Sequence, residues 1–249
     1  MATVVELSAR YANFLVHPLL PGLGVCQICR GPATKGYPTC LPCHGTRTVL
    51  GSGVADAVVP VSLALKGEQY AHELWRYKNA AGPQRQYFRT GLAAVLWRFL
   101  EAHEACVAHR CAVRGFDVVT TVPSTSGRQT HPLRAMVADM IGATRERHRD
   151  LLRATPKAAD LGRTASSARY TASPLWGEHV LLVDDTWTTG NHVQSAAAAL
   201  KSAGAGTVAV VVLGRHLNSD YEHTAAHVEQ ARLRRFSWDV CPVRPWAHG

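Results

Sequence analysis

The 249-residue sequence contains no run of 18 apolar residues free of charges and helix breakers, so it predicts no insertion into a membrane. Its first residues, MATVVELSAR, lack the basic start and apolar centre of a signal peptide, which favours a cytoplasmic protein. Internal repeats and low-complexity tracts are also absent. Because 47% of the residues are hydrophobic, the chain can form a packed core, and this excludes intrinsic disorder.

Acidic residues are scarce: 18 Asp and Glu stand against 27 Lys and Arg, and the formal net charge is +9. A positive balance of this size favours anionic partners, either phosphorylated small molecules or nucleic acid. The basic residues between Arg110 and Arg169 are spread out rather than gathered in one run. We therefore interpret most of them as solvated surface.

Four of the seven cysteines form two C-x-x-C pairs, CQIC and CLPC, separated by ten residues. Two turns that each offer two thiolates at this spacing are typical of a tetrahedral zinc site. Disulfides are the alternative, and the expected cytoplasmic location argues against them. Because a closed four-thiolate site has no open position on the metal, we expect it to support folding rather than catalysis. The predicted Zn²⁺ ligands are Cys26, Cys29, Cys40 and Cys43, and the other cysteines (Cys106, Cys111 and Cys241) are interpreted as ordinary residues.

Strand-like and helix-like segments alternate along most of the chain. A β-rich run at Val54–Gly67 precedes two helical segments, and a second strand is expected at Asp117–Val122. A strand (His179–Val183), a loop, a helix (Asn191–Ala203) and a strand (Thr207–Leu213) are expected next, and VAVVVL in the last of them is apolar enough for a strand buried on both faces. This order predicts an α/β protein with a parallel sheet.

The chain divides by these patterns into two parts. Residues 1–48 are predicted to form an N-terminal helix, ending before Pro18, and the zinc knuckle. Residues 49–249 are predicted to form the α/β domain, with its core at 115–215. Within this domain, the stretch 145–173 has weak periodicity, many small residues and several arginines, which is typical of a mobile basic loop.

The segment VLLVDDTWTTG, residues 180–190, places two carboxylates directly before a loop of hydroxyls that ends in glycine. Ligands of parallel sheets bind at the carboxyl ends of strands, beside helix N-termini. There, free backbone amides, the helix dipole and three threonine hydroxyls favour an anion, and Gly190 lets the backbone approach it. Asp184 and Asp185 would repel a phosphate, so we expect them to bind hydroxyls or a metal ion. A ribose 5-phosphate satisfies both halves of the motif.

Other phosphate-binding patterns do not fit this segment. A Walker loop needs a lysine directly after its last glycine, where this chain has Asn191, and no G-x-G-x-x-G follows a strand here. A turn in which Asp and Thr only cap a helix is the remaining alternative. Its position between two apolar strands argues against that alternative.

The same segment resembles the ribose-phosphate-binding motif of type I phosphoribosyltransferases. Together with the cysteine pairs, YKN after a helix, and DVVTTVPS, it makes the chain similar to the ComF family of competence-associated, amidophosphoribosyltransferase-like proteins. The resemblance implies a type I phosphoribosyltransferase-like parallel sheet flanked by helices. It also implies a Mg²⁺-dependent glycosyltransferase that transfers 5-phosphoribose from phosphoribosyl pyrophosphate to an unidentified acceptor, with release of pyrophosphate.

The resemblance further assigns roles to individual residues. Asp184 and Asp185 would be the catalytic pair that contacts the ribose hydroxyls. The 5-phosphate would contact the residues that follow them, Thr186, Trp187, Thr188, Thr189 and Gly190. The diphosphate would face a second loop, made of Ser124, Thr125, Ser126, Gly127 and Arg128.

Departures from the family pattern keep a second function open. Trp187 is bulky for a phosphate loop, His192 replaces a usual hydroxyl, and the arginine-rich segment after the diphosphate loop is shortened to GRQTHPLR. The alternative is a non-catalytic sensor of the same ligand, or a DNA-uptake adaptor that binds single-stranded DNA or competence proteins. The sequence is compatible with a monomer and with an oligomer.

Two further short motifs are interpreted as solvent-exposed residues. Lys78, in WRYKN, is interpreted as a solvated residue at a helix end, with a reach into the site as the alternative. HTAAH places His223 and His227 at the i, i+4 spacing of metal ligands, but no acidic partner is evident. We interpret this pair as part of a solvated helix face.

Overall fold

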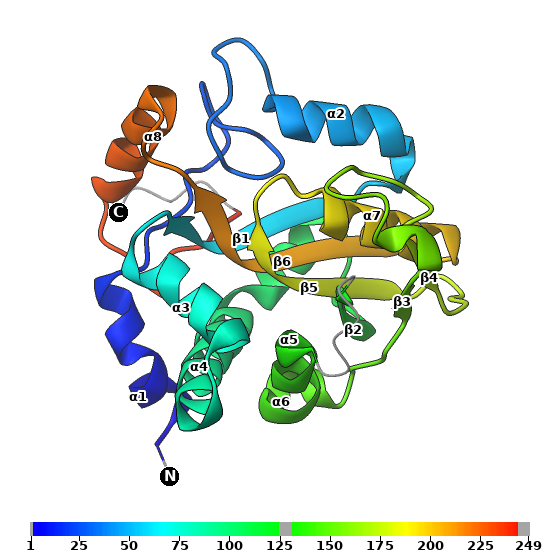
Figure 1. Cartoon of the computed structure of the whole chain (residues 1–249), viewed down its shortest axis with the longest axis horizontal. Helices are drawn as coiled ribbons and strands as arrows, with labels where there is room; N and C mark the ends of the chain where they lie inside the picture. Colours follow the sequence, from blue (N-terminus) through cyan, green and yellow to red (C-terminus); the bar gives the residue numbers. More distant parts are fainter. Residues whose placement is uncertain (1, 125–130, 244–249) are drawn as a thin grey trace.

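A four-stranded sheet in the order β1-β6-β5-β2 forms the centre of the computed structural model, which describes residues 2–124 and 131–243 (Figure 1). All three neighbouring pairs are parallel. The strands are β1 (Ala57–Leu65), β2 (Val118–Thr121), β5 (His179–Trp187) and β6 (Thr207–Leu217). The predicted α/β protein with a parallel sheet flanked by helices is confirmed.

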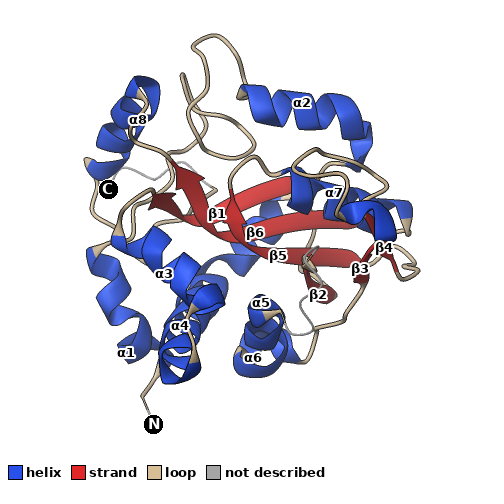
Figure 2. Ribbon diagram, viewed as in Figure 1, coloured by secondary structure: helices blue, strands red, loops and turns tan. Residues whose placement is uncertain are grey.

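Both faces of the sheet are covered, so successive strand residues enter different cores. Val59, Leu181 and Val211 belong to a core shared with the helices of one layer, whereas Val58 and Leu182 belong to the core of the other. Figure 2 shows helices above and below the sheet. The first layer contains α1 (Val4–Ala9), the short helix η1 (Arg10–Asn13), α3 (Gln69–Asn79), α4 (Gly82–Arg110), α5 (Pro132–Ala135), a π-helical turn (Met136–Met140) and α6 (Gly142–Arg145).

The second layer combines helix, hairpin and cysteine module. Its helices are α2 (Leu41–Leu50) and α7 (Asn191–Ser202), with the one-turn helices Gly51–Gly53 and Pro156–Ala158. The last helix, α8 (Glu222–Arg232), packs through Val228 and Ala231 on the carboxyl ends of β1 and β6. None of the described helices combines the length and the apolarity that are needed to cross a membrane.

The N-terminal helix is shorter than predicted. Helical structure ends at Asn13 rather than near Pro18, and an extended bridge between Val16 and Leu63 follows. The side chain of Ser62 explains the change, because its hydroxyl accepts a hydrogen bond from Val16 N (2.9 Å) and donates one to Val16 O (3.0 Å). The chain therefore lies along β1 before it enters the cysteine module.

The predicted mobile basic loop contains a short antiparallel hairpin instead. Its strands are β3 (Leu152–Ala154) and β4 (Tyr170–Ala172). Arg169, which is fully buried, holds the intervening segment by donating hydrogen bonds to the carbonyls of Ala158 (2.9 Å), Gly162 (3.0 Å) and Thr164 (2.7 Å). The segment is thus held by one arginine that bonds several main-chain carbonyls, and not by an apolar face that would give the sequence a periodic pattern.

Candidate functional site

A cavity of about 460 Å³ opens at the carboxyl end of β5. It is lined by five of the residues that were predicted to bind ribose phosphate, namely Asp184, Thr186, Thr188, Thr189 and Gly190. The remaining lining residues are Arg163, Asn191, His192, Val193 and His216. The cavity lies where ligands of parallel sheets bind, beside the first turn of the helix that follows the strand.

The strand is longer than the sequence indicated. We expected β5 to end at Val183, but the ladder continues until Thr186 pairs with Gly214 and Trp187 with Arg215. It continues because β6 runs on to Leu217 and supplies partners beyond the acid pair. Only Thr188, Thr189 and Gly190 therefore form the loop.

The loop and the start of α7 form an anion seat. Gly190 has φ +84°, a left-handed conformation that glycine adopts without strain, and no side chain caps the helix. The first-turn amides, from Asn191 to Val193, have no hydrogen-bond acceptor among the described residues. Free amides and the positive end of the helix dipole make this a suitable place for a phosphate.

Trp187 supports the loop from inside the protein. Its side chain is 1% exposed, and a Cβ added to Gly190 would lie 2.1 Å from its ring carbon Cζ2. The guanidinium of Arg215 donates to the carbonyls of Trp187 (3.1 Å) and Thr188 (3.0 Å). The bulk of the tryptophan is thus accommodated in the core, and it forces residue 190 to be glycine.

The two aspartates point in different directions. Asp184 lies half-buried on the cavity wall, whereas Asp185 is 3% exposed and is not among the lining residues. The carboxylate of Asp185 accepts hydrogen bonds from the Tyr77 hydroxyl and from Lys78 Nζ (2.6 Å). Both donors lie in the last turns of α3, and the interpretation of Lys78 as a solvated residue is wrong, because it pairs with Asp185 beside the cavity rather than on the cavity wall.

The charges of the pair are unequal as a result. Burial and the neighbouring charge of Asp185 raise the pKa of Asp184 to about 8. Burial also acts on Asp185, but Lys78 and Tyr77 outweigh it, and the pKa of Asp185 is lowered. Near neutral pH these two residues are therefore one carboxylate that already has hydrogen-bond donors and one carboxyl group that still carries its proton.

Replacing Asp184 with asparagine is expected to stabilise the protein in alkaline solution. The folded state keeps the proton of Asp184 up to about pH 8, whereas the unfolded chain releases it near the ordinary value of 3.8. The unfolded state thus binds fewer protons between these values, and wild-type stability falls as the pH rises through this window. Urea unfolding should show wild type and Asp184→Asn alike at pH 4. The variant should be more stable by about 2 kcal/mol at pH 8.5, and equal stability at both pH values would contradict the raised pKa.

The predicted diphosphate loop is only partly described. Ser124 follows β2 and is half-buried, while Thr125, Ser126, Gly127 and Arg128 lie outside the described residues. The chain returns to the same edge of the sheet at His131, whose charge lowers the pKa of Asp185. The two flanks of this loop therefore lie near the carboxyl ends of β2, an edge strand, and of its neighbour β5.

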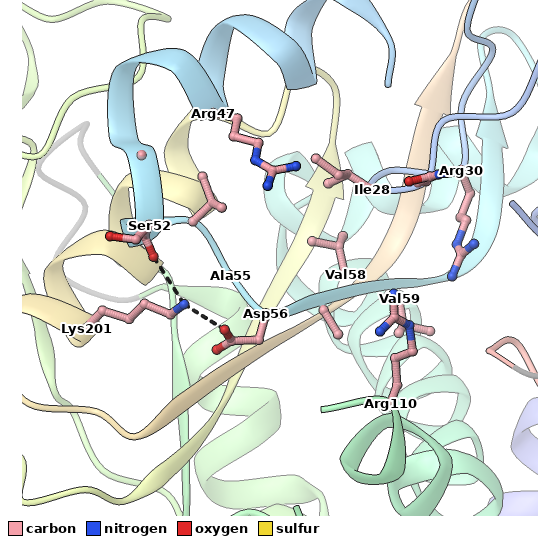
Figure 3. Close-up of a pocket in the computed structure, with 14 residues that line it drawn as sticks. Ile28, Arg30, Arg47, Ser52, Ala55, Asp56, Val58, Val59, Arg110 and Lys201 are labelled. Carbon is pink, nitrogen blue, oxygen red and sulfur yellow. Dashed lines mark hydrogen bonds and ion pairs between the residues drawn. The ribbon is translucent and has the colours of Figure 1, made fainter. Parts of the chain in front are cut away.

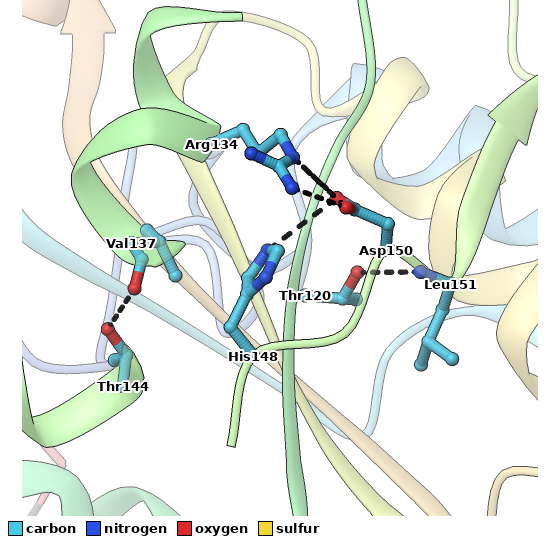
Figure 4. A network of polar contacts seen from close by, with 7 residues as sticks. All are labelled: Thr120, Arg134, Val137, Thr144, His148, Asp150 and Leu151. Carbon is cyan, nitrogen blue, oxygen red and sulfur yellow. Dashed lines mark hydrogen bonds and ion pairs between the residues drawn. The ribbon is translucent and has the colours of Figure 1, made fainter. Parts of the chain in front are cut away.

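A polar network fixes the segment that follows this loop (Figure 4). Arg134, in α5, donates two hydrogen bonds to the carboxylate of Asp150, Nε to Oδ1 at 2.8 Å and Nη2 to Oδ2 at 2.7 Å. His148 lies beside the same carboxylate at 3.8 Å, and the hydroxyl of Thr120 accepts from Leu151 N (3.4 Å). The network joins α5, β2 and the start of the hairpin at the site's edge.

Sequence reasoning missed two basic residues on the cavity wall. Arg163, from the hairpin segment, lines the cavity, and its carbonyl accepts a hydrogen bond from Asn191 Nδ2. His216 lines the cavity from the end of β6 and bonds the carbonyl of Ala64 (3.1 Å). The density of arginines in 145–173 was a signal for the first, whereas the second depends on the unexpected length of β6. His192 is also a lining residue, but burial and then Arg169 lower its pKa, so it contributes no charge near neutral pH.

The four predicted zinc ligands come together in a buried group. The potential ligand atoms of Cys26, Cys29, Cys40 and Cys43 lie within 4.8 Å of one another, and the sulfurs of Cys29 and Cys40 are 3.7 Å apart. Hydrogen bonds toward the other cysteines raise the pKa values of Cys40 and Cys43. A cation at the centre of the group would favour their thiolates, so the cluster can hold a metal ion such as zinc.

The potential ligand atoms of Cys106, Cys241 and His103 form a second group, within 4.8 Å of one another, and the interpretation of these cysteines as ordinary residues stays a prediction. His227 was assigned to a solvated helix face, but it is buried, bonds the backbone of Arg30 and has its pKa lowered by burial to about 4. His227 thus packs α8 against the cysteine module.

Comparisons with known proteins do not assign the chain to a family. No family model matches the chain, and a search of curated proteins found no match. The cavity at β5 and the cysteine cluster are therefore the features that bear on the function of this protein.

Proposed function

We propose that this protein is a type I phosphoribosyltransferase-like protein of the ComF kind, which binds phosphoribosyl pyrophosphate with Mg²⁺ and transfers 5-phosphoribose to an acceptor. One observation carries the proposal: a single cavity joins an anion seat at the start of α7 to the carboxyl group of Asp184. A ligand that satisfies both parts carries a phosphate at one end and hydroxyls or a metal ion a few atoms away.

Each part of the ligand has a matching group. The 5-phosphate would accept hydrogen bonds from the amides of α7 and from Thr188 and Thr189, with Arg163 as the counter-charge. The ribose hydroxyls would bond to Asp184, while Lys78 and Tyr77 keep Asp185 ionised beneath them. Groups at different positions along this cavity would thus bind the phosphate and the ribose hydroxyls, so that the phosphate would not lie directly against the carboxylates, which would repel it.

The residues also suit Mg²⁺. Carboxylate oxygens are hard ligands, and the raised pKa of Asp184 marks a position where a cation would replace a proton. Mg²⁺ bound there would neutralise charge on the diphosphate. The chain's own contribution is to hold the sugar phosphate in place and to set the negative charges of the acid pair near the anomeric carbon, where positive charge develops during transfer.

We also propose that the four-cysteine group binds one structural Zn²⁺. Four thiolates suit this ion in tetrahedral geometry, and the group is buried away from the cavity's lining residues. Cys40 is the residue before α2, and Cys43 lies in the first turn of that helix. The metal would therefore fix the start of α2.

Calorimetric titration with phosphoribosyl pyrophosphate and Mg²⁺ tests the proposed function. We expect wild type to bind, and Asp184→Asn to lose about 100-fold in affinity, because it removes the contact with hydroxyl groups and metal while the fold is kept. Asp220→Asn is the matched control, since Asp220 lies on the surface, where it pairs with Lys66. Its affinity should equal that of wild type.

The same experiment separates the alternatives. Binding of phosphoribosyl pyrophosphate without release of its pyrophosphate, whichever acceptor is added, would favour a non-catalytic sensor. No binding by a folded, metal-loaded wild type would refute the proposal. If such a protein bound single-stranded DNA with a strong salt dependence, its charge of +9 would instead favour the adaptor.

A further inference from the structure

A second cavity, of about 570 Å³, lies at the other end of the sheet (Figure 3). Its floor is the start of β1, from Asp56 to Val59, and its walls come from α2, the cysteine module and the ends of α4 and α7. Ala57 is level with Leu181 through their common partner Ala209, near the amino end of β5. The cavity is therefore separate from the proposed ribose-phosphate site at the carboxyl ends.

The lining of this cavity is strongly basic. It includes Arg30, Arg47, Arg110 and Lys201, whereas its one acidic residue is Asp56. That carboxylate is already engaged, because it accepts from Lys201 Nζ (2.7 Å) and from Val208 N (2.8 Å). Within the described residues, no hydrogen bond or ion pair is formed by the three arginine side chains. Three positive charges thus face one cavity, and none of them is paired with a carboxylate among the described residues.

Arg30 is the least expected of the three. It is 4% exposed, and its Nε and Nη1 atoms are buried without a hydrogen-bond partner. Its guanidinium and that of Arg110 extend toward the same region beside Val59 (Figure 3). The nearby sulfurs of Cys26 and Cys29 attract its charge but accept no hydrogen bond from it. Burying an unbonded guanidinium beside a second one is unfavourable unless an anion joins them.

We propose that this cavity binds a phosphorylated small molecule, with the phosphate between Arg30 and Arg110. Guanidinium groups bind phosphate oxygens in pairs, and an anion at this position would satisfy the buried donors of Arg30. The lining also includes apolar side chains, namely Ile28, Val54 and Val58. The volume is within the range of pockets that enclose small ligands, so a phosphate attached to a flat apolar group, as in a nucleoside monophosphate, matches both kinds of side chain.

Calorimetric titration of the full chain with AMP and with inorganic phosphate tests this site. Arg110→Gln is the informative variant, because Arg110 is an exposed residue at the end of α4 and lies outside the cysteine module. Arg114→Gln is the matched control, since it removes the same charge from an exposed residue that does not line the cavity. We expect Arg110→Gln to weaken AMP binding at least tenfold and Arg114→Gln to leave it unchanged.

The remaining arms identify the ligand class. Inorganic phosphate should bind more weakly than AMP and should lose affinity in the same variant, because it lacks the apolar group. Binding of phosphoribosyl pyrophosphate should be the same in wild type and Arg110→Gln, so this proposal stands or falls separately from the proposed function. Equal AMP binding by wild type and Arg110→Gln would overturn it. So would a loss in Arg110→Gln of oligonucleotide binding alone, which would assign the arginines to a nucleic acid.

Discussion

Replacing Cys43 with serine is expected to abolish metal binding and to lower the free energy of unfolding by about 5 kcal/mol, the largest effect that we predict. Structural zinc sites contribute an apparent binding free energy of about 10–16 kcal/mol, and the folding of small metal-binding modules depends on it. The four cysteines are buried and belong to the same core as Val58 and Leu182 of the sheet. Loss of the ion would leave three thiols in that core without the ligand that organises them.

Metal content and stability can be measured on the same samples. We expect one zinc per chain in wild type, a tetrahedral thiolate spectrum after substitution by Co²⁺, and neither in Cys43→Ser. Cys111→Ser is the control, because Cys111 belongs to neither group of potential metal ligands. A Cys43→Ser protein that keeps its metal and its urea midpoint would show that the cluster is not a structural site.

Replacing Lys78 with methionine should have the second-largest effect, a loss of about 3 kcal/mol of stability at pH 7.5. Lys78 Nζ lies 2.6 Å from a carboxylate that is 4% exposed, and removing one partner of a buried ion pair leaves the other charge uncompensated. The pKa of Asp185 is lowered, so the pair stabilises the fold above its ordinary value of 3.8 and loses this effect as the pH falls. The difference between variant and wild type should therefore persist down to about pH 4 and shrink below it.

Lys66→Met provides the comparison for this measurement. Lys66 Nζ lies 2.7 Å from Asp220, a distance much like that in the Lys78 pair, but both side chains are more than half exposed. Surface pairs of this kind contribute between 0 and about 1 kcal/mol. Urea unfolding of the two variants should differ clearly at pH 7.5. If both lose equally little, Asp185 is not a buried charge that depends on Lys78.

The parallel sheet was predictable because burial on both faces leaves a clear mark in the sequence. VAVVVL can form a strand only between two cores, and it lies in β6 at the centre of the sheet. The cysteine group was predictable for a different reason: two C-x-x-C pairs at this spacing are typical of four thiolates that surround one tetrahedral metal ion. In both cases the information is local to a short stretch of the chain.

The division of labour between the two aspartates was not predictable in this way. In an extended strand, neighbouring side chains point to opposite faces, so the length of β5 decides that Asp184 faces the cavity and Asp185 faces α3. That length depends on partners that β6 supplies about 30 residues later in the chain. The hairpin at β3 and β4 escaped prediction similarly, because Arg169 stabilises it through carbonyls that carry no sequence signal.

Helix α2 belongs to two structures at once. It carries Cys43, and its Thr46 hydroxyl lies 2.5 Å from Oδ1 of Asn191, the residue at which α7 and the proposed phosphate-binding turn begin. If the proposed zinc ion fixes α2, a preparation that is short of zinc would be a mixture of molecules in which the first turn of α7 is well placed or displaced, even while the sheet remains intact. Affinities measured for such a protein would then depend on its zinc occupancy, and preparations made with and without a chelator are expected to differ.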